Sequence, residues 1–284
     1  MTHDVGEGLL ASAAALAFPR RSGSEGDRRV IEELSARLEG LGLHVAVEDF
    51  SYELAPVERI LRWSLLGGAG LVVLAGWLSH SSPIWTLAAM IVVVLCGGIV
   101  LGWSPWLEGL YRRPGTTRTA NVVGRREAAE AGRRLILMAH HDSKSQSLAL
   151  PARMGATLGA LIGVVGVVVC AGVVLAGRGD GLSWMGVTAG VVAGTAMVAL
   201  AGMSSGNDSP GGVDNAGSLA IVLELAARLR ELPPDVELVV LFTGAEEDHM
   251  VGAMRWLDLH AEELEKLTAD CFNFDGAGSP GRVV

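Results

Sequence analysis

The sequence contains few cysteines and few aromatic residues, and both shortages limit the class of protein it can belong to. Of its 284 residues only 3 are cysteine and 5% are aromatic, although 50% are hydrophobic. Cys96, Cys170 and Cys271 lie far apart and form no Cys-x-x-Cys pair, so we expect neither a disulfide framework nor a cysteine-ligated zinc site. The apolar residues are mainly Val, Leu, Ala and Gly, a mixture more typical of lipid-facing helices than of an aromatic-rich soluble core.

A basic run of the kind that binds nucleic acid is also missing. The formal net charge is −9, and acidic residues are spread along the chain. The apolar stretch at residues 9–18 follows Asp4 and Glu7 rather than a basic segment, unlike the start of a signal peptide. We therefore expect no nucleic-acid partner, and the N-terminus does not read as a cleaved signal.

Four long, nearly uncharged apolar runs occur in two pairs, at residues 60–78 with 84–103 and at 155–177 with 183–203. Each run is near the roughly 20 residues that cross a bilayer. Tryptophans stand at the ends of the runs, as interfacial anchors do: Trp63, Trp77, Trp85, Trp103 and Trp184. We predict two transmembrane hairpins, and the alternative is a pair of hairpins buried in a large soluble core.

Two hairpins return the chain to its starting side, so the remaining segments share one compartment and can build one domain. The predicted organisation is one domain built from segments 1–59, 104–154 and 204–284, interrupted by hairpins at 60–103 and 155–203. The shared side carries the basic residues that flank the runs: Arg59, Arg62, Arg112, Arg113, Arg118 and Arg153. The opposite side has only Arg178. We therefore predict a multi-pass protein of the lipid bilayer whose shared side is cytoplasmic.

The segments outside the runs alternate between helical and strand patterns. Helices are predicted at 26–41, 216–232 and 248–267, and strands at 44–50, 134–139, 237–243 and 270–274. This alternation predicts an α/β fold with an open, largely parallel sheet and flanking helices, interrupted by the two hairpins. Ligands of such sheets bind at the carboxyl ends of the strands.

Polar residues gather at those strand ends and in a glycine-rich loop before a helix: His140, Asp142, Asp214, Glu246, Glu247 and Asp275. Singly, each has an ordinary structural explanation, such as a helix cap or a turn. Together they supply nitrogen and oxygen donors without cysteine, the set that suits hydrolytic zinc. Two cations a few ångströms apart can clamp an attacking oxygen, with a nearby carboxylate as the base.

Four stretches carry a family resemblance: LILMAHHDS, GGVDNAGSLAIVLELA, VELVVLFTGAEED and FNFD, in that order. With the opening segment AFPRRSGSEGDRRVIEELSARLEGLGLHVAVEDFSYE, they resemble metallopeptidase family twenty-eight, the co-catalytic zinc aminopeptidases. The family includes secreted bacterial enzymes and multi-pass forms of the endoplasmic reticulum. The resemblance implies a membrane-anchored aminopeptidase that hydrolyses N-terminal peptide bonds of a peptide substrate through a metal-activated water.

The resemblance also implies a ligand set for two zinc ions. His140 and Asp275 would be terminal ligands of one zinc, Asp214 would bridge both, and Glu247 would be a terminal ligand of the other. The family's final His ligand has no counterpart after Asp275. We therefore expect either a fragment or a truncated relative with an impaired second metal site.

The remaining roles are also implied by the resemblance. Glu246 would be the general base, and Asp142 would orient the His140 imidazole. His141 is expected to be exposed or to support the ligands from behind, and His249 is expected on the surface.

Three alternatives stay open. A glutaminyl cyclase uses the same frame with one zinc, although the adjacent glutamates and the AHHDS context favour a peptidase. A non-catalytic membrane scaffold would keep the fold, and the missing His favours it. A small transporter is disfavoured, because no polar residue interrupts the apolar runs in the way a transport path requires.

Overall fold

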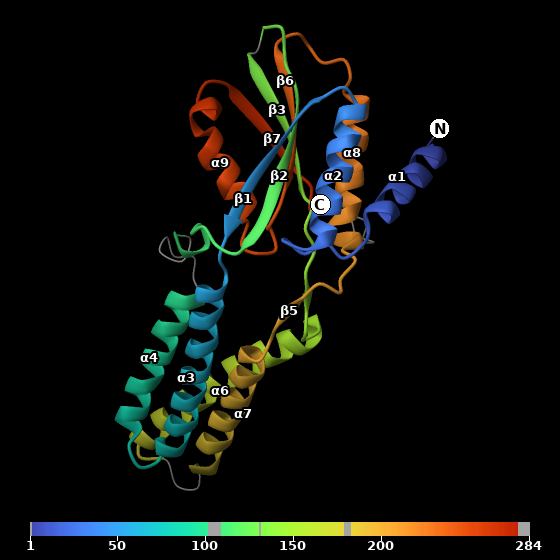
Figure 1. Cartoon of the computed structure of the whole chain (residues 1–284). Helices are drawn as coiled ribbons and strands as arrows, with labels where there is room; N and C mark the ends of the chain where they lie inside the picture. Colours follow the sequence, from blue (N-terminus) through green and yellow to red (C-terminus); the bar gives the residue numbers. More distant parts are fainter. Residues whose placement is uncertain (1, 102–108, 131, 179–182, 278–284) are drawn as a thin grey trace. The chain divides into compact units, whose positions relative to one another are not determined.

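The computed structural model describes residues 2–101, 109–130, 132–178 and 183–277, and the chain divides into two compact units. A sheet unit comprises Met1–Glu53, Tyr111–Ser145 and Gly206–Val284, and a helical unit comprises Leu54–Leu110 and Gln146–Ser205. Both units are discontinuous in sequence, because two helical pairs interrupt the chain that builds the sheet (Figure 1).

Within the described residues, the sheet unit has a five-stranded sheet in the order β1-β2-β6-β3-β7. Its strands are β1 (His44–Tyr52), β2 (Thr117–Arg126), β6 (Val236–Thr243), β3 (Arg133–His140) and β7 (Thr268–Asn273). Strand β3 pairs in parallel with β6 and β7, whereas β2 is antiparallel to both of its neighbours, β1 and β6. Only β2 therefore runs against the other strands, and the predicted α/β fold with an open, largely parallel sheet is confirmed.

Helices cover both faces of the sheet except at its edge strand β7. They are α1 (Thr2–Leu16), α2 (Glu25–Gly40), α8 (Gly217–Arg228) and α9 (Val251–Leu264), with a π-helical turn η1 (Gly212–Ala216) before α8. Alternation along β6 divides the core, since Leu238, Val240 and Phe242 pack toward α2 and α8. Val239 and Leu241 pack instead with Trp256 of α9. The covered sheet holds the strand ends in fixed relative positions.

Several elements differ from the sequence prediction. Strand β2 and helix α1 were not predicted, and the short strands β4 (Ser145–Gln146) and β5 (Ser205–Gly206) pair with each other. Helix α9 begins at Val251 rather than at residue 248, because His249 and Met250 have left-handed φ angles that a helix does not accept. Strand β7 is exposed along its whole length.

The helical unit contains α3 (Ala55–Leu78), α4 (Pro83–Leu101), α6 (Leu150–Leu175) and α7 (Ser183–Ala201). By length and composition α3, α6 and α7 can each cross a membrane, whereas the described apolar part of α4 is shorter. Helices α3 and α7 approach closely, since a Cβ on Gly76 would lie 2.5 Å from the main-chain oxygen of Gly186. Small residues allow such packing between membrane helices.

The predicted anchor residues Trp63, Trp77, Trp85 and Trp184 have exposed side chains in the helical unit. Trp103 lies outside the described residues. Large exposed side chains on apolar helices are what a lipid environment accommodates and water does not.

Candidate metal centre

The candidate centre lies where the parallel strands end. His140 is the last residue of β3 and pairs with Thr243, the last residue of β6. Asp275 follows β7 by two residues, and Asp214 lies in η1 at the start of α8. Carboxyl ends of parallel strands meet at one edge of a sheet, so the register of the strands brings these distant residues together.

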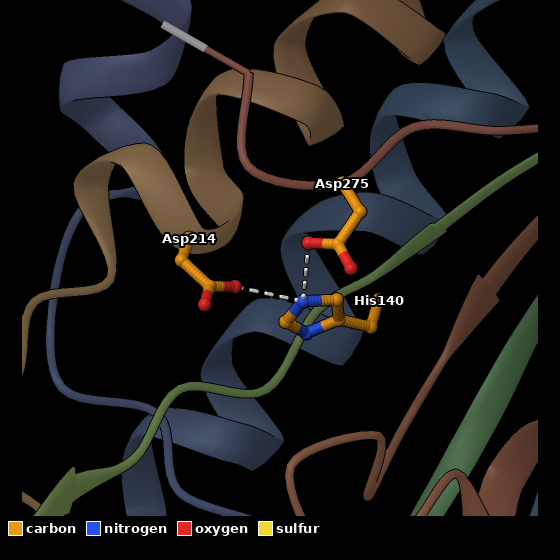
Figure 2. Close-up of side chains that lie close together, drawn as sticks. All are labelled: His140, Asp214 and Asp275. Carbon is orange, nitrogen blue, oxygen red and sulfur yellow. Dashed lines mark ion pairs between the residues drawn. The ribbon is translucent and has the colours of Figure 1, made fainter. Parts of the chain in front are cut away.

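His140, Asp214 and Asp275 form a compact group of possible metal ligands. One ligand atom from each lies within 4.8 Å of the other two. The His140 Nε2 atom is 2.9 Å from Asp214 Oδ1 and 3.5 Å from Asp275 Oδ1. Figure 2 shows both carboxylates directed at this imidazole. The His140 ring is buried, while both carboxylates are half-exposed, so the centre is accessible from the carboxylate side.

The His140 ring is oriented by Asp142. The Nδ1 atom lies 3.2 Å from the Asp142 main-chain oxygen and 3.4 Å from its Oδ1 atom. With the proton on Nδ1, the Nε2 lone pair faces the carboxylates, and the buried Nε2 has no aligned hydrogen-bond partner among the described residues. A lone pair facing carboxylates is repulsive unless a positive charge lies between them.

That positive charge can be a proton or a cation. Burial alone would lower the pKa of His140, yet the Asp142 and Asp214 carboxylates raise it to about 11. The same carboxylates would attract a cation, and one imidazole with carboxylates and no thiolate is a zinc-type donor set. The residues present therefore fit zinc.

Asp142 also holds the loop that follows β6. Its Oδ1 and Oδ2 atoms accept hydrogen bonds from the main-chain N–H groups of Glu246 (3.0 Å) and Glu247 (3.2 Å). Burial would raise the pKa of Asp142, but the hydrogen bond from His140, together with the His140 and His141 charges and the Glu246 N–H, lowers it. A single buried carboxylate thus connects the β3 end, with His140, to the β6 end, with both glutamates.

The two glutamates differ in their place in the centre. Glu246 Oε2 lies 3.7 Å from His140 Nε2. Glu247 is not in the three-residue ligand group found among the described residues. Burial raises the pKa of both carboxyls, and with the Asp214 charge it brings the pKa of Glu247 to about 7. A raised pKa suits a carboxylate that takes up and returns a proton near neutral pH.

The loop that carries Asp214 requires glycine at its start. Gly211 has a φ of +54°, and a Cβ there would lie 2.6 Å from Ser143 Cβ. The peptide bond between Asp214 and Asn215 is cis. Asn215 Nδ2 donates to the main-chain oxygen of Phe274 at 3.1 Å, which links this loop to the residue before Asp275.

Arg20 was not singled out from the sequence, because a charged residue in an aperiodic segment gives no signal of burial. Its guanidinium is fully buried and donates to five main-chain oxygens, those of Leu16, Phe18, His141, Pro210 and Gly211. Burial lowers the pKa of Arg20 to about 10, although the Asp142 and Asp214 charges oppose that shift. Arg20 thereby joins the loop after His140 to the loop before Asp214.

The two remaining motif histidines lie outside the ligand group. His141 is fully buried rather than exposed, with Nε2 2.9 Å from the Ala120 main-chain oxygen and Nδ1 3.6 Å from Asp27 Oδ1. His249 is exposed, as predicted, and stacks on Tyr111 with 4.3 Å between ring centroids.

Comparisons with known proteins agree with the motifs. Residues 194–284 match the profile described as "Peptidase family M28". The chain is 34% identical over 74 residues to a vacuolar membrane protease of Schizosaccharomyces japonicus (strain yFS275 / FY16936), covering 26% of this chain and 8% of that protein. It is 34% identical over 71 residues to aminopeptidase YwaD of Bacillus subtilis (strain 168), covering 25% and 16%.

A solved aminopeptidase from Aneurinibacillus sp. strain AM-1 superposes with a TM-score of 0.49 and 16% identity, over 96% of this chain and 71% of that one. The alignments with the two curated relatives span only a small part of their lengths. Residues 194–284 match the model of Peptidase family M28, and the resemblance predicted from the four motifs is confirmed.

Proposed function

We propose that this protein is a zinc-dependent aminopeptidase, which hydrolyses the peptide bond that follows the free N-terminal residue of a peptide. The observation that carries the proposal is the convergence of Asp214 and Asp275 on the buried Nε2 atom of His140, with Glu246 beside them.

His140, Asp214 and Asp275 would hold one zinc ion. Asp214 would also reach a second ion, with Glu247 as a further ligand. Bound zinc polarises a substrate carbonyl and lowers the pKa of a bound water. The half-exposed carboxylates leave room for both substrate and water on the open side of the centre.

Glu246 would move the proton. Its Oε2 atom would take a proton from the attacking water and later return it to the leaving amine nitrogen. Burial raises the pKa of Glu246, which favours this exchange, and the carboxylate is one-third exposed and open to the substrate side. Asp142 would keep the His140 ring in the tautomer whose Nε2 lone pair faces the Asp214 and Asp275 carboxylates, where the zinc ion would bind.

For the helical unit we propose two transmembrane hairpins, α3 with α4 and α6 with α7, in a multi-pass protein. Three of these helices are long and apolar enough to cross a bilayer. The basic residues beside the helices favour a cytoplasmic peptidase unit. The five segment boundaries predicted from the sequence are part of this proposal.

A glutaminyl cyclase is the second candidate. The observation that favours it is that the described residues provide one group of three ligands, as a one-zinc enzyme requires. Glu246 would then take a proton from the N-terminal amine as it attacks the side-chain amide carbon, and would return it to the ammonia that leaves.

Substrates separate the candidates. The full chain, supplied with zinc, is assayed with leucine p-nitroanilide and with a glutaminyl peptide, beside Glu246→Gln and the exposed control Glu262→Gln. We expect anilide hydrolysis that falls at least about a hundredfold in Glu246→Gln with zinc content retained, the usual scale of general-base catalysis. Cyclisation without anilide hydrolysis would favour the cyclase. Neither activity, with zinc bound, would favour the scaffold.

A further inference from the structure

The loop after β6 is held in an unfavourable backbone conformation. Ala245, His249 and Met250 have φ angles of 54°, 71° and 56°, in the left-handed region that residues other than glycine rarely occupy. Such conformations persist only where surrounding contacts impose them, and they cluster at functional sites. The loop carries Glu246 and Glu247, so the contacts that impose its shape also place these two residues.

The first half of the loop is held by residues already described or adjacent to them. The Ala245 N–H donates to Ser22 Oγ at 3.0 Å, and the Asp142 carboxylate accepts from the next two N–H groups. These contacts fix the direction in which the chain leaves β6. They do not reach Asp248 or the turn that follows it.

The second half is held by Lys144. Its Nζ atom donates to the main-chain oxygen of Glu247 at 2.8 Å and to Asp248 Oδ1 at 2.7 Å. The other oxygen of Asp248 accepts a 2.6 Å hydrogen bond from the Tyr52 hydroxyl. Lys144 and Asp248 are nearly buried and Tyr52 is fully buried, so water screens these contacts little.

The glutamate side chains depend on this support. Within the described residues, no hydrogen bond is found to the carboxylate of Glu246 or Glu247. Their positions are therefore set by the backbone that carries them. We call residues 245–250 the glutamate turn. Lys144 comes two residues after Asp142, so the loop that follows His140 also binds the second half of this turn.

We propose that Lys144, through its ion pair with Asp248 and its hydrogen bond to Glu247, is a positioning residue that holds the glutamate turn against the metal centre. The inference rests on the proposed function, because it assigns Lys144 to the placement of the general base and of a zinc ligand. A purely structural ion pair would instead stabilise the fold without any specific link to the glutamates.

The test uses the full chain and four variants: Lys144→Met, Lys144→Arg, Glu247→Gln and the double variant Lys144→Met/Glu247→Gln. Lys266→Met is the matched control, since Lys266 is exposed beyond α9. Zinc alone is titrated by calorimetry into each protein, and kcat and KM are measured with leucine p-nitroanilide. Melting temperatures show whether each variant folds, and Lys144→Arg keeps the charge if the Met variant does not fold.

We expect Lys144→Met to lower kcat at least about tenfold with KM changed less than about threefold, because a misplaced group mainly affects the transition state. Lys144→Met should lower zinc affinity about tenfold in the wild-type background and less than about twofold in the Glu247→Gln background. The effects of two residues are not additive when one acts through the other. Lys144→Arg should recover most of both losses.

Equal losses of zinc affinity in the two backgrounds would overturn the proposal, because Lys144 would then not act through Glu247. Unchanged kcat and zinc affinity in Lys144→Met would also overturn it. An inactive wild-type chain that binds zinc would contradict the proposed function, and the zinc titrations would still decide the role of Lys144.

Discussion

Replacing Asp142 by Asn tests the connection between the two loops of the centre. The Asp142 carboxylate accepts two main-chain N–H groups, one on each oxygen, and faces the Nδ1 atom of His140. Asparagine has the same shape but only one acceptor oxygen. Its NH2 group must therefore face either the Glu247 N–H, or both the Glu246 N–H and the His140 Nδ1 atom.

The structure sets the size of the effect. Loss of one hydrogen bond to a charged acceptor costs about 1.5–3 kcal/mol. The N–H left buried without a partner costs about 1–3 kcal/mol more. We expect Asp142→Asn to lower the free energy of unfolding by about 3–5 kcal/mol. Zinc affinity should fall about 10–100-fold, the usual cost of losing the residue that orients a histidine ligand.

The assay combines urea unfolding with calorimetric zinc titration. Asp235→Asn is the control, because the Asp235 carboxylate is half-exposed and its ion pair with Arg133 is a long one, 3.9 Å from the Nε atom. Such an exposed contact is worth less than about 1 kcal/mol. An Asp142→Asn protein with the stability and the zinc affinity of the wild type would refute the reasoning that one carboxylate joins both loops.

Three further changes have definite expected outcomes. Gly211→Ala should cost about 1–3 kcal/mol in urea unfolding and weaken zinc binding, because φ is +54° and the new Cβ meets Ser143; wild-type behaviour would contradict this. Hydrogen bonds from Arg125 hold the pKa of Glu263 at about 2. A depressed pKa adds stability above the ordinary carboxyl pKa of about 4.3 that is lost as pH falls toward 2. Because Glu263 is one-third exposed, Glu263→Gln should cost only about 1–2 kcal/mol at neutral pH and less than half of that near pH 3; a loss independent of pH would contradict the linkage. In a background without the native cysteines, Ser81→Cys, between α3 and α4, should react with a membrane-impermeant thiol reagent from the non-cytoplasmic side; reaction from the cytoplasmic side alone would reverse the proposed topology.

The sequence indicated the strand ends and the residues that follow them because buried parallel strands are continuous apolar runs. The runs before His140 and after Val236 are of this kind, and their register brings His140 beside Thr243. Asp275 could be placed near His140 for the same reason, since ligands gather at strand ends, whereas the ligand role of Asp214 was implied by the family resemblance.

Strand β2 could not be predicted because its buried positions include polar side chains. The Thr119 hydroxyl donates to Asp27 Oδ1 at 3.1 Å. Asn121 Nδ2 donates to the Gly252 main-chain oxygen, and Asn121 Oδ1 accepts from the Gly244 N–H. These partners lie far away in sequence, so a pattern of hydrophobic residues does not reveal the strand.

The supports of the centre were missed for a similar reason. Arg20, Lys144 and Tyr52 contact loops that lie 103 to 196 residues away in the sequence, and no local pattern marks a charged side chain as buried. Sequence motifs therefore gave the groups that can hold a metal, while the groups that hold those loops in place became evident only from the fold.

The most direct test of the central claim is the zinc content of the purified full chain and of Asp214→Ala, measured by elemental analysis against protein concentration. The proposed centre predicts that the wild type retains zinc and that Asp214→Ala loses most of it, because Asp214 would contribute to both ions. Equal zinc content in the two proteins would contradict the account.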